Sequence, residues 1–114
     1  MPRQTDSPGT DGAVLDLERL RAQTGGDRAL EGEVLRLFLT KSRSDLGRIR
    51  AAASAATRRE AAHALLGSAR AIGALAVARC AEALQAGEGS PEAVAALERA
   101  LAATEAAIRG RLAV

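Results

Sequence analysis

Apolar residues recur along most of the chain at spacings of three and four residues, which is the period of an amphipathic helix. The first such segment is AVLDLERLRAQTGG, where Leu15, Leu17 and Leu20 lie on one short helix. The glycine pair Gly25 and Gly26 follows directly and predicts that this helix ends there. The periodic part of the chain therefore opens with a short helix.

A longer helix is predicted from Asp27 onward, because an aspartate side chain can cap the first free backbone N–H groups. Gly32 and Gly47 lie within this segment and weaken the helical pattern. Its predicted apolar stripe consists of Leu30, Val34, Leu37, Phe38, Leu46 and Ile49. Such a stripe is typical of a long amphipathic helix.

Three further helices follow in the second half of the chain. Thr57 and Glu60 have the spacing of a capping box and predict the start of the first of them, which Gly73 ends. The apolar face of the next helix consists of Leu75, Val77, Cys80, Ala81 and Leu84. Ser90 and Pro91 then predict an N-cap and a first helical residue. The stripe of this last helix consists of Val94, Leu97, Leu101, Thr104, Ile108 and Leu112.

These elements predict an all-α fold, an antiparallel up-and-down four-helix bundle with a short extra helix at the N-terminus. The composition agrees, because alanine is abundant, tryptophan and tyrosine are absent and only one phenylalanine is present. A chain of 114 residues corresponds to one domain. We place the bundle at residues 13–114 and assign residues 1–12, which lack periodicity, to a disordered tail.

Composition also excludes several classes of function. The 16 basic residues are interleaved with 14 acidic ones and stacking aromatics are few, so we expect no binding to nucleic acid. No segment has the length of a membrane span, and Cys80 is a lone cysteine whose simplest role is that of a small buried apolar residue. We therefore expect a cytoplasmic protein. Heavy use of Ala, Arg and Gly, with Lys41 as the single lysine, is typical of a high-GC bacterial genome.

The only histidine, His63, lies in the segment AAHALLGSARAIGA. At about 100° per residue, the buried stripe of this helix is formed by Ala62, Leu65, Ala69 and Ile72. His63 then faces water, together with Gly67 and Arg70. A glycine inside a helix costs about 1 kcal/mol relative to alanine. Because Gly67 points outward and has no packing role, we interpret it as a bare position that leaves the imidazole open to a partner.

This arrangement suits transient phosphorylation. Neutral imidazole is a competent nucleophile, and the guanidinium of Arg70 can swing back over Gly67 and donate hydrogen bonds to a phosphoryl group on His63. Ser68 is a second candidate for contacting the phosphoryl group, unless its hydroxyl bonds to the carbonyl four residues earlier. The alternative from these residues alone is a spectator histidine on a solvated surface.

The segment HALLGSARAIGA resembles the H-x-L-K-G-S-A-x-x-x-G-A signature of histidine-containing phosphotransfer (HPt) domains. The matching positions are His63, Leu65, Gly67, Ser68, Ala69, Gly73 and Ala74. LDLERLRAQTGGD resembles the first helix and following turn of the family, VLRLFL its second helix, and CAEALQ its fourth. Two positions depart from the pattern. Leu66 replaces the family lysine, and Gln85 replaces a glutamate, which we interpret as a surface change of little consequence.

The resemblance implies that His63, through Nε2, exchanges a phosphoryl group with the aspartate of a response-regulator receiver domain. The receiver would bring Mg²⁺, and the chain would need no metal or cofactor of its own. It would be a phosphoryl carrier without autonomous kinase activity, with Arg70 in place of the missing lysine. The predicted access and docking surface consists of Gly67, Leu66, Ala64 and Arg59.

The predicted partners are receiver domains, with a hybrid histidine kinase as a further candidate, and the predicted state is a monomer. Two alternatives remain open at this point. The first is an HPt-like helical module that docks a receiver or kinase without carrying phosphate, with Leu66 as the trace of that loss. The second is a dimeric phosphotransferase or scaffold whose last helices pair between subunits.

Overall fold

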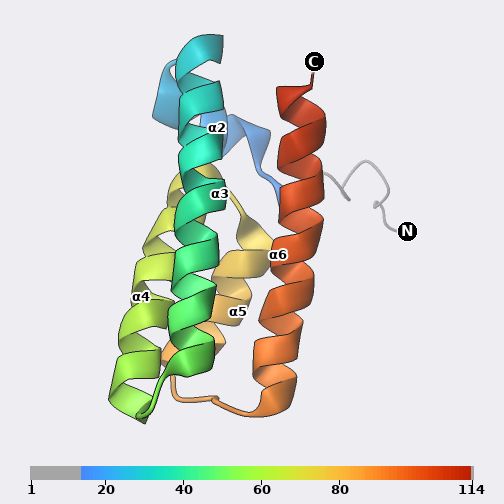
Figure 1. Ribbon diagram of the computed structural model, residues 1–114. Coiled ribbons are helices and arrows are strands. Elements are labelled where there is room, and N and C mark those ends of the chain that lie inside the picture. The colour runs from blue at the N-terminus through green and yellow to red at the C-terminus, as the bar shows by residue number, and fades with distance from the viewer. Residues whose placement is uncertain (1–13, 114) are drawn as a thin grey trace, which may run out of the picture.

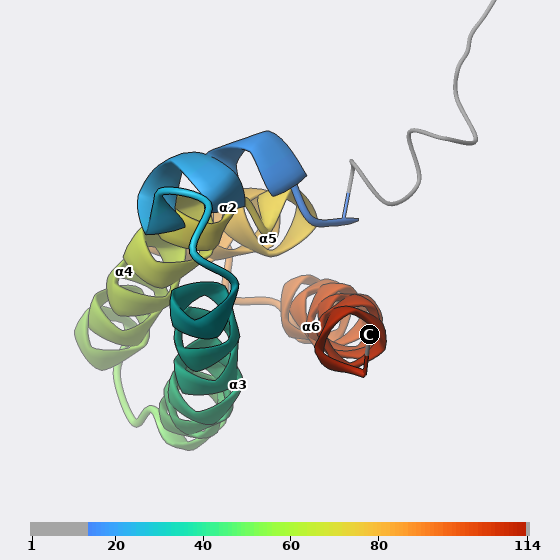
Figure 2. The same cartoon turned by 90° about the horizontal axis from the view of Figure 1, so that it is seen from above.

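The computed structural model describes residues 14–113, which form five helices joined by short turns. They are α2 (Leu17–Thr24), α3 (Arg28–Ala51), α4 (Ala55–Ile72), α5 (Leu75–Gln85) and α6 (Pro91–Leu112). The four longer helices alternate in direction, and the view from above shows α4 and α6 at opposite corners of the bundle (Figure 1, Figure 2). The predicted all-α bundle is confirmed. The predicted tail at residues 1–12 lies outside the described residues.

The short helix α2 packs on α4 and α3 at one end of the bundle. Its first turn is capped by Asp16, whose Oδ1 accepts a hydrogen bond from the backbone N–H of Glu18 at 3.1 Å. Its last turn ends at Gly25, which has a left-handed backbone with φ of 65°. Asp27 then caps α3, as the sequence predicts.

The start of α4 differs from the prediction. Ser54 is the N-cap, and its hydroxyl accepts a hydrogen bond from the backbone N–H of Thr57 at 3.1 Å. Thr57 and Glu60 lie inside the helix, so the predicted capping box is wrong. The serine three residues earlier already satisfies the first free N–H group, and the helix therefore begins one turn sooner. The predicted cap of α6 by Ser90 is confirmed.

The core lies between the four long helices and is rich in alanine where α4 and α5 meet. Both helices bury alanine without any exposed surface, as at Ala69 and Ala81. Small side chains allow helix axes to approach to about 8 Å. The larger members of the core are Leu15, Leu20, Leu35, Phe38, Ile49, Leu65, Leu66, Ile72, Val77, Leu84, Leu97, Leu101 and Ile108.

The buried face of α3 differs from the predicted stripe. Two predicted core residues, Leu30 and Leu37, are 41% and 65% exposed. The predicted burial of Phe38 and Ile49 is confirmed. The full set of residues that α3 buries is Glu31, Leu35, Phe38, Ser42, Asp45 and Ile49. These positions alternate by four and three residues, but half of them are polar. The stripe predicted from apolar residues alone is therefore rotated about the helix axis relative to the face that is buried. Gly32 and Gly47 do not interrupt the helix.

The turn between α4 and α5 holds the segment before α2. Gly73 ends α4 with φ of 78°, and its carbonyl accepts a hydrogen bond from the backbone N–H of Asp16 at 2.7 Å. A Cβ at position 73 would lie 2.7 Å from the Asp16 carbonyl oxygen. Only glycine fits this backbone conformation and this close approach. The contact fixes α2 beside the end of α4.

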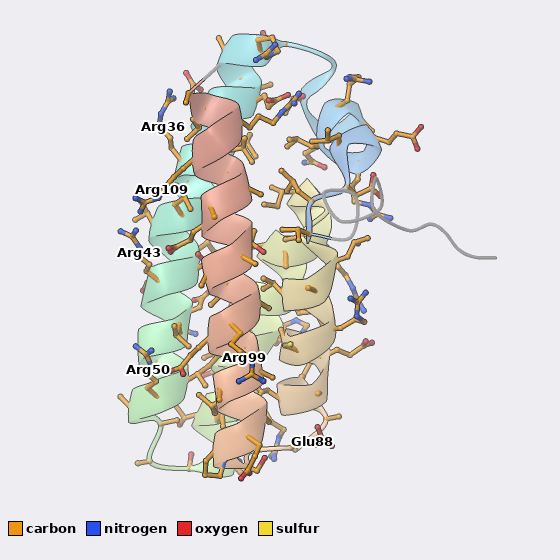
Figure 3. The ribbon with its side chains drawn as sticks, turned by 90° about the vertical axis from the view of Figure 1, so that its right-hand side faces the viewer. Arg36, Arg43, Arg50, Glu88, Arg99 and Arg109 are labelled. Atoms are coloured by element: carbon orange, nitrogen blue, oxygen red, sulfur yellow. The ribbon has the colours of Figure 1, made fainter. Side chains whose placement is uncertain are left out.

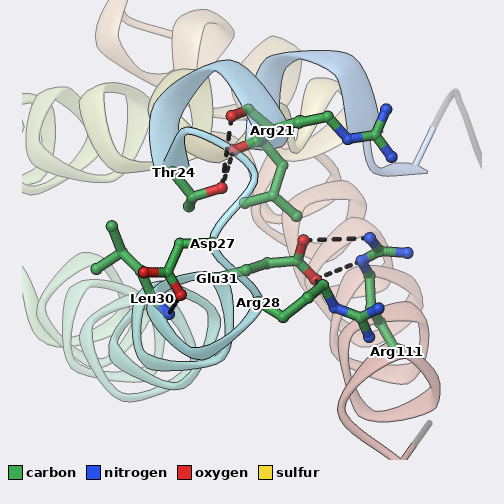
Figure 4. Close-up of polar contacts among 8 residues, drawn as sticks. Arg21, Thr24, Asp27, Arg28, Leu30, Glu31 and Arg111 are labelled. Carbon is green, nitrogen blue, oxygen red and sulfur yellow. Dashed lines mark hydrogen bonds and ion pairs between the residues drawn. The ribbon is translucent and has the colours of Figure 1, made fainter.

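A partly buried ion pair joins the first turn of α3 to the last turn of α6. Arg111 donates two hydrogen bonds to Glu31, from Nε at 2.6 Å and from Nη2 at 3.1 Å (Figure 4). Hydrogen bonding from Arg111 lowers the pKa of Glu31 below its ordinary value of 4.5, and the same contact raises the pKa of Arg111. The charged pair therefore stabilises the folded chain.

We expect the substitution Glu31→Gln to lower the free energy of unfolding at pH 7 by about 2 kcal/mol, because it removes charge-assisted hydrogen bonds to Arg111. The folded-state pKa of Glu31 is depressed, so its contribution is full above the unfolded value and is lost as pH falls through the folded value. The variant should therefore lose less stability on acidification. Urea unfolding at several pH values measures this. The matched control is Glu105→Gln, which removes a more exposed pair with Arg43 and should cost under about 1 kcal/mol.

Candidate functional site

The outer face of α4 carries His63, Gly67 and Arg70, and all three are exposed to solvent. The four residues predicted to be buried on this helix are buried, as the helical angles require. A Cβ built on Gly67 would meet nothing within 4 Å. No packing constraint accounts for this glycine. The predicted exposure of the imidazole, and the open space beside it, are both confirmed.

The imidazole is held from the neighbouring helix α5 by Gln85. The side-chain amide nitrogen of Gln85 lies 2.8 Å from Nδ1 of His63. Because one ring nitrogen is engaged with α5, the other one, Nε2, is left for a partner. Gln85, interpreted from the sequence as a surface change of little consequence, thus contacts the imidazole directly. The sequence places Gln85 near the end of this helix, but its position opposite His63 depends on how α4 and α5 pack.

The amide of Gln85 can select the tautomer of the ring. When its nitrogen faces Nδ1, the amide donates to the ring and the proton of the neutral imidazole resides on Nε2. When its oxygen faces the ring, the amide accepts from an N–H at Nδ1, and Nε2 has a free lone pair. The second arrangement is the one in which Nε2 is nucleophilic. A glutamine supports both arrangements by a half-turn of one side chain.

Arg70 does not lie over Gly67. Its Nη2 is 3.3 Å from Oε2 of Glu82 on α5, so the predicted approach of the guanidinium to the ring is not present in this structure. The reason is that α5 offers a carboxylate at this level, which sequence periodicity does not reveal. Ser68 bonds back to the carbonyl of Ala64 at 3.2 Å, so its hydroxyl already has an acceptor.

The predicted docking surface is only partly exposed. Leu66 is 5% exposed and belongs to the core, so its assignment to the docking surface is wrong. The helix α4 packs against α3, α5 and α2 and therefore buries a wider face than a single stripe. Ala64 is half-buried, whereas Arg59 is exposed beside His63 on the outer face. The surface open to a partner is thus formed by polar and small side chains on α4.

Two hollows border this face. An open hollow of about 630 Å³ lies between α2 and α4 and reaches Gly67 and Arg70. A smaller groove of about 140 Å³ lies between α3 and α4, where the exposed Leu37 stands opposite Ser68 and Ala71. The residues lining this α3–α4 groove are Val34, Leu37, Phe38, Lys41, Ser68, Ala71 and Ile72. A partner that covers His63 from the α3 side meets an apolar surface.

The described part of the chain offers little support for a metal site, a reactive thiol or a membrane-spanning helix. Within residues 14–113, no three His, Cys, Asp or Glu side chains are grouped so that they could hold a metal ion. Burial raises the pKa of the half-buried Cys80 thiol, which keeps it protonated and poorly nucleophilic at neutral pH. None of the helices between residues 14 and 113 combines the length and apolar character that a bilayer crossing needs.

Comparison with known families agrees with this geometry. A family model of the Hpt domain matches residues 33–107, which is more than half of the chain. The chain therefore belongs to the Hpt domain family. Hpt domains are histidine phosphotransfer modules of phosphorelays; they carry phosphoryl groups and interact with response-regulator receivers. No curated protein and no solved structure matches the chain at a significant level.

Proposed function

We propose that this protein is a phosphorelay intermediate in which Nε2 of His63 accepts a phosphoryl group from the aspartate of a response-regulator receiver domain and returns it to such an aspartate. The single observation that supports this most directly is the exposed imidazole held at Nδ1 by Gln85. The chain acts as a carrier without kinase activity of its own. The proposed setting is the cytoplasm of a bacterium, with a hybrid histidine kinase as a further candidate partner.

The transfer step uses the arrangement in which the amide oxygen of Gln85 has turned to face Nδ1 in place of the amide nitrogen. The lone pair of Nε2 attacks phosphorus of the aspartyl phosphate, the N–P bond forms, and the bond from phosphorus to the carboxyl oxygen breaks. The aspartate leaves as a carboxylate. Positive charge then develops on the ring, and the amide oxygen of Gln85 accepts the Nδ1–H that shares this charge. In the reverse direction the same bonds exchange roles, and no proton has to leave the imidazole.

The receiver supplies the rest of the chemistry, including the Mg²⁺ that it is expected to bring. On this chain, Arg70 is the proposed contact for the phosphoryl oxygens, because Leu66 occupies the place of the family lysine. Ser68 is a weaker candidate, since its hydroxyl would have to leave the Ala64 carbonyl. Gly67 keeps the approach to the ring free, and Arg59 borders it.

The test is incubation of the protein with phosphorylated receiver domains from the source organism. A carrier takes up phosphoryl label in an acid-labile form, because an N–P bond hydrolyses in acid. The presence of Leu66 in place of lysine favours one other function, a module that binds receivers without accepting phosphate. That alternative predicts a complex with a receiver but no label on the protein.

We further propose that the α3–α4 groove contacts the receiver during transfer. Leu37 is 65% exposed on this groove, and burying such a leucine stabilises a complex by about 1–2 kcal/mol. We expect Leu37→Glu to slow transfer from a phosphorylated receiver about tenfold or more, because the new charge would have to be desolvated. Labelling by phosphoramidate, a small chemical donor, should be unchanged.

The matched control for this prediction is Leu17→Glu. Leu17 is also exposed, at 37%, but it borders a different hollow, between the start of α2 and the end of α6. We expect this control to transfer at the rate of the unmodified protein. Equal rates for the two variants, measured at the same receiver concentration, would show that the groove is not part of the contact.

A further inference from the structure

The ion pair between Arg70 and Glu82 links the outer face of α4 to α5. Its atoms lie 3.3 Å apart, and the two side chains are 56% and 62% exposed. Exposed pairs of this kind are weak, so the guanidinium can exchange one acceptor for another. Glu82 lies one helical turn before Gln85, which contacts the ring of His63. One helix therefore places an amide on the ring and a carboxylate on the nearby arginine.

Arg70 can reach a group attached to His63. The two residues are seven positions apart, so they lie about 10.5 Å apart along the helix axis and within about 20° of the same direction. The side chains of Arg70 and His63 both lean toward the N-terminus of α4, and the greater length of arginine shortens the gap between its guanidinium and the ring. Gly67 lies between them, and a Cβ built there would meet nothing within 4 Å. No side chain at position 67 therefore separates Arg70 from the imidazole.

We propose that Glu82 restrains Arg70 in the unphosphorylated protein and that a phosphoryl group on His63 displaces Glu82 from the guanidinium. This inference rests on the proposed role of His63. A phosphoryl dianion offers three oxygens and about twice the charge of a carboxylate, so it is the better acceptor for a guanidinium. Glu82 is a positioning residue, because it acts on the phosphoryl group only through Arg70.

The exchange changes the charge pattern that a partner meets. Before phosphorylation, Arg70 and Glu82 neutralise one another; afterwards Arg70 faces the phosphoryl group and Glu82 is a free carboxylate on α5. The other charged side chains around this corner are Asp16, Glu18 and Arg19 at the start of α2 and Arg79 on α5. A receiver that approaches the loaded protein therefore meets a carboxylate at a place where the unloaded protein presents an ion pair.

The test uses the full chain and phosphoramidate as donor. The donor's P–N bond breaks, the Nε2–P bond forms, and the amine leaves as ammonia. The titration of the attached phosphoryl group is then followed by ³¹P NMR. Arg70→Gln should raise the titration midpoint, because the guanidinium favours the dianion. Glu82→Gln should lower it by about 0.2–0.7 pH units, the range expected for one exposed ion pair.

The double variant of Arg70→Gln with Glu82→Gln decides between the proposed route and a direct effect. If Glu82 acts through Arg70, the double variant has the midpoint of Arg70→Gln alone. An equal downward shift on the Arg70→Gln background would show that the carboxylate acts directly on the phosphoryl group and would overturn the inference. So would an unchanged midpoint in Glu82→Gln.

The matched control is Glu98→Gln, which removes the same charge from an exposed pair with Arg50 at 2.6 Å. This pair lies on the α3–α6 side of the bundle, where Arg36, Arg43 and Arg50 follow α3 (Figure 3). It should leave the midpoint unchanged. Phosphoramidate labels an exposed imidazole directly, so this reaction needs no partner protein. Failure to accept label from receivers would therefore overturn the proposed function alone, whereas the midpoints test the role of Glu82.

Discussion

Replacing His63 with glutamine is expected to abolish every acid-labile phosphoryl label on the protein, whether the donor is a phosphorylated receiver or phosphoramidate. The chain has a single histidine, so no second imidazole can accept the group. The amide of glutamine has no lone pair that is basic enough to attack phosphorus. Gel autoradiography before and after acid treatment, with ³¹P NMR of the labelled protein, measures the loss.

The loss should occur without unfolding. His63 is exposed, and surface substitutions of this kind usually change stability by less than about 0.5 kcal/mol. Circular dichroism and the urea midpoint of His63→Gln should therefore match those of the unmodified protein. Gln85→Ala is the comparison within the site, because it removes the contact at Nδ1 and keeps the imidazole. Receiver-dependent label on His63→Gln would show that another residue is the acceptor.

Replacing Gly73 with alanine is expected to lower the free energy of unfolding by about 3 kcal/mol. Position 73 has φ of 78°, which costs a residue with a Cβ about 1 kcal/mol or more. The Cβ would also lie 2.7 Å from the carbonyl oxygen and from Cβ of Asp16, so the backbone there has to move. A domain of this size has only about 5–15 kcal/mol of stability.

The substitution Gly25→Ala separates the cost of the left-handed backbone from the cost of the close approach to Asp16. Gly25 has a similar φ of 65°, but a Cβ there would meet nothing within 4 Å. It should therefore cost only the backbone term, about 1 kcal/mol. Urea unfolding of both variants at pH 7 gives the difference. If the two losses are equal, the contact between Gly73 and Asp16 does not contribute to stability.

Much of the fold could be predicted from local signals. Asp27, Ser90, Gly25 and Gly73 act at helix ends as their chemistry requires, because caps and left-handed turns depend on a few neighbouring atoms. The face of α3 could not be predicted in the same way. Buried polar residues occupy half of it, and only the partner helix shows that Glu31 has an arginine to bind there.

In the candidate site too, features determined within one helix could be predicted from the sequence, whereas contacts between helices could not. The exposure of His63 and Gly67 follows from angles along one helix, so sequence was sufficient for it. The partners of that face, Gln85 and Glu82, come from a different helix. Their register is fixed by how α4 and α5 pack, which no spacing within one segment reveals. Leu66 is buried for the same reason, since three neighbours cover α4.

The alanines at the contact between α4 and α5 have a consequence for chemistry at the surface. A short amide reaches the imidazole only if the two helix backbones lie near one another, and methyl side chains permit that nearness. The distance between α4 and α5, which these alanines set, therefore decides whether Gln85 can contact the ring and tune its reactivity. A larger side chain in place of one of these alanines would push the two helices apart. It would thereby change the environment of the His63 ring nitrogens without contacting them.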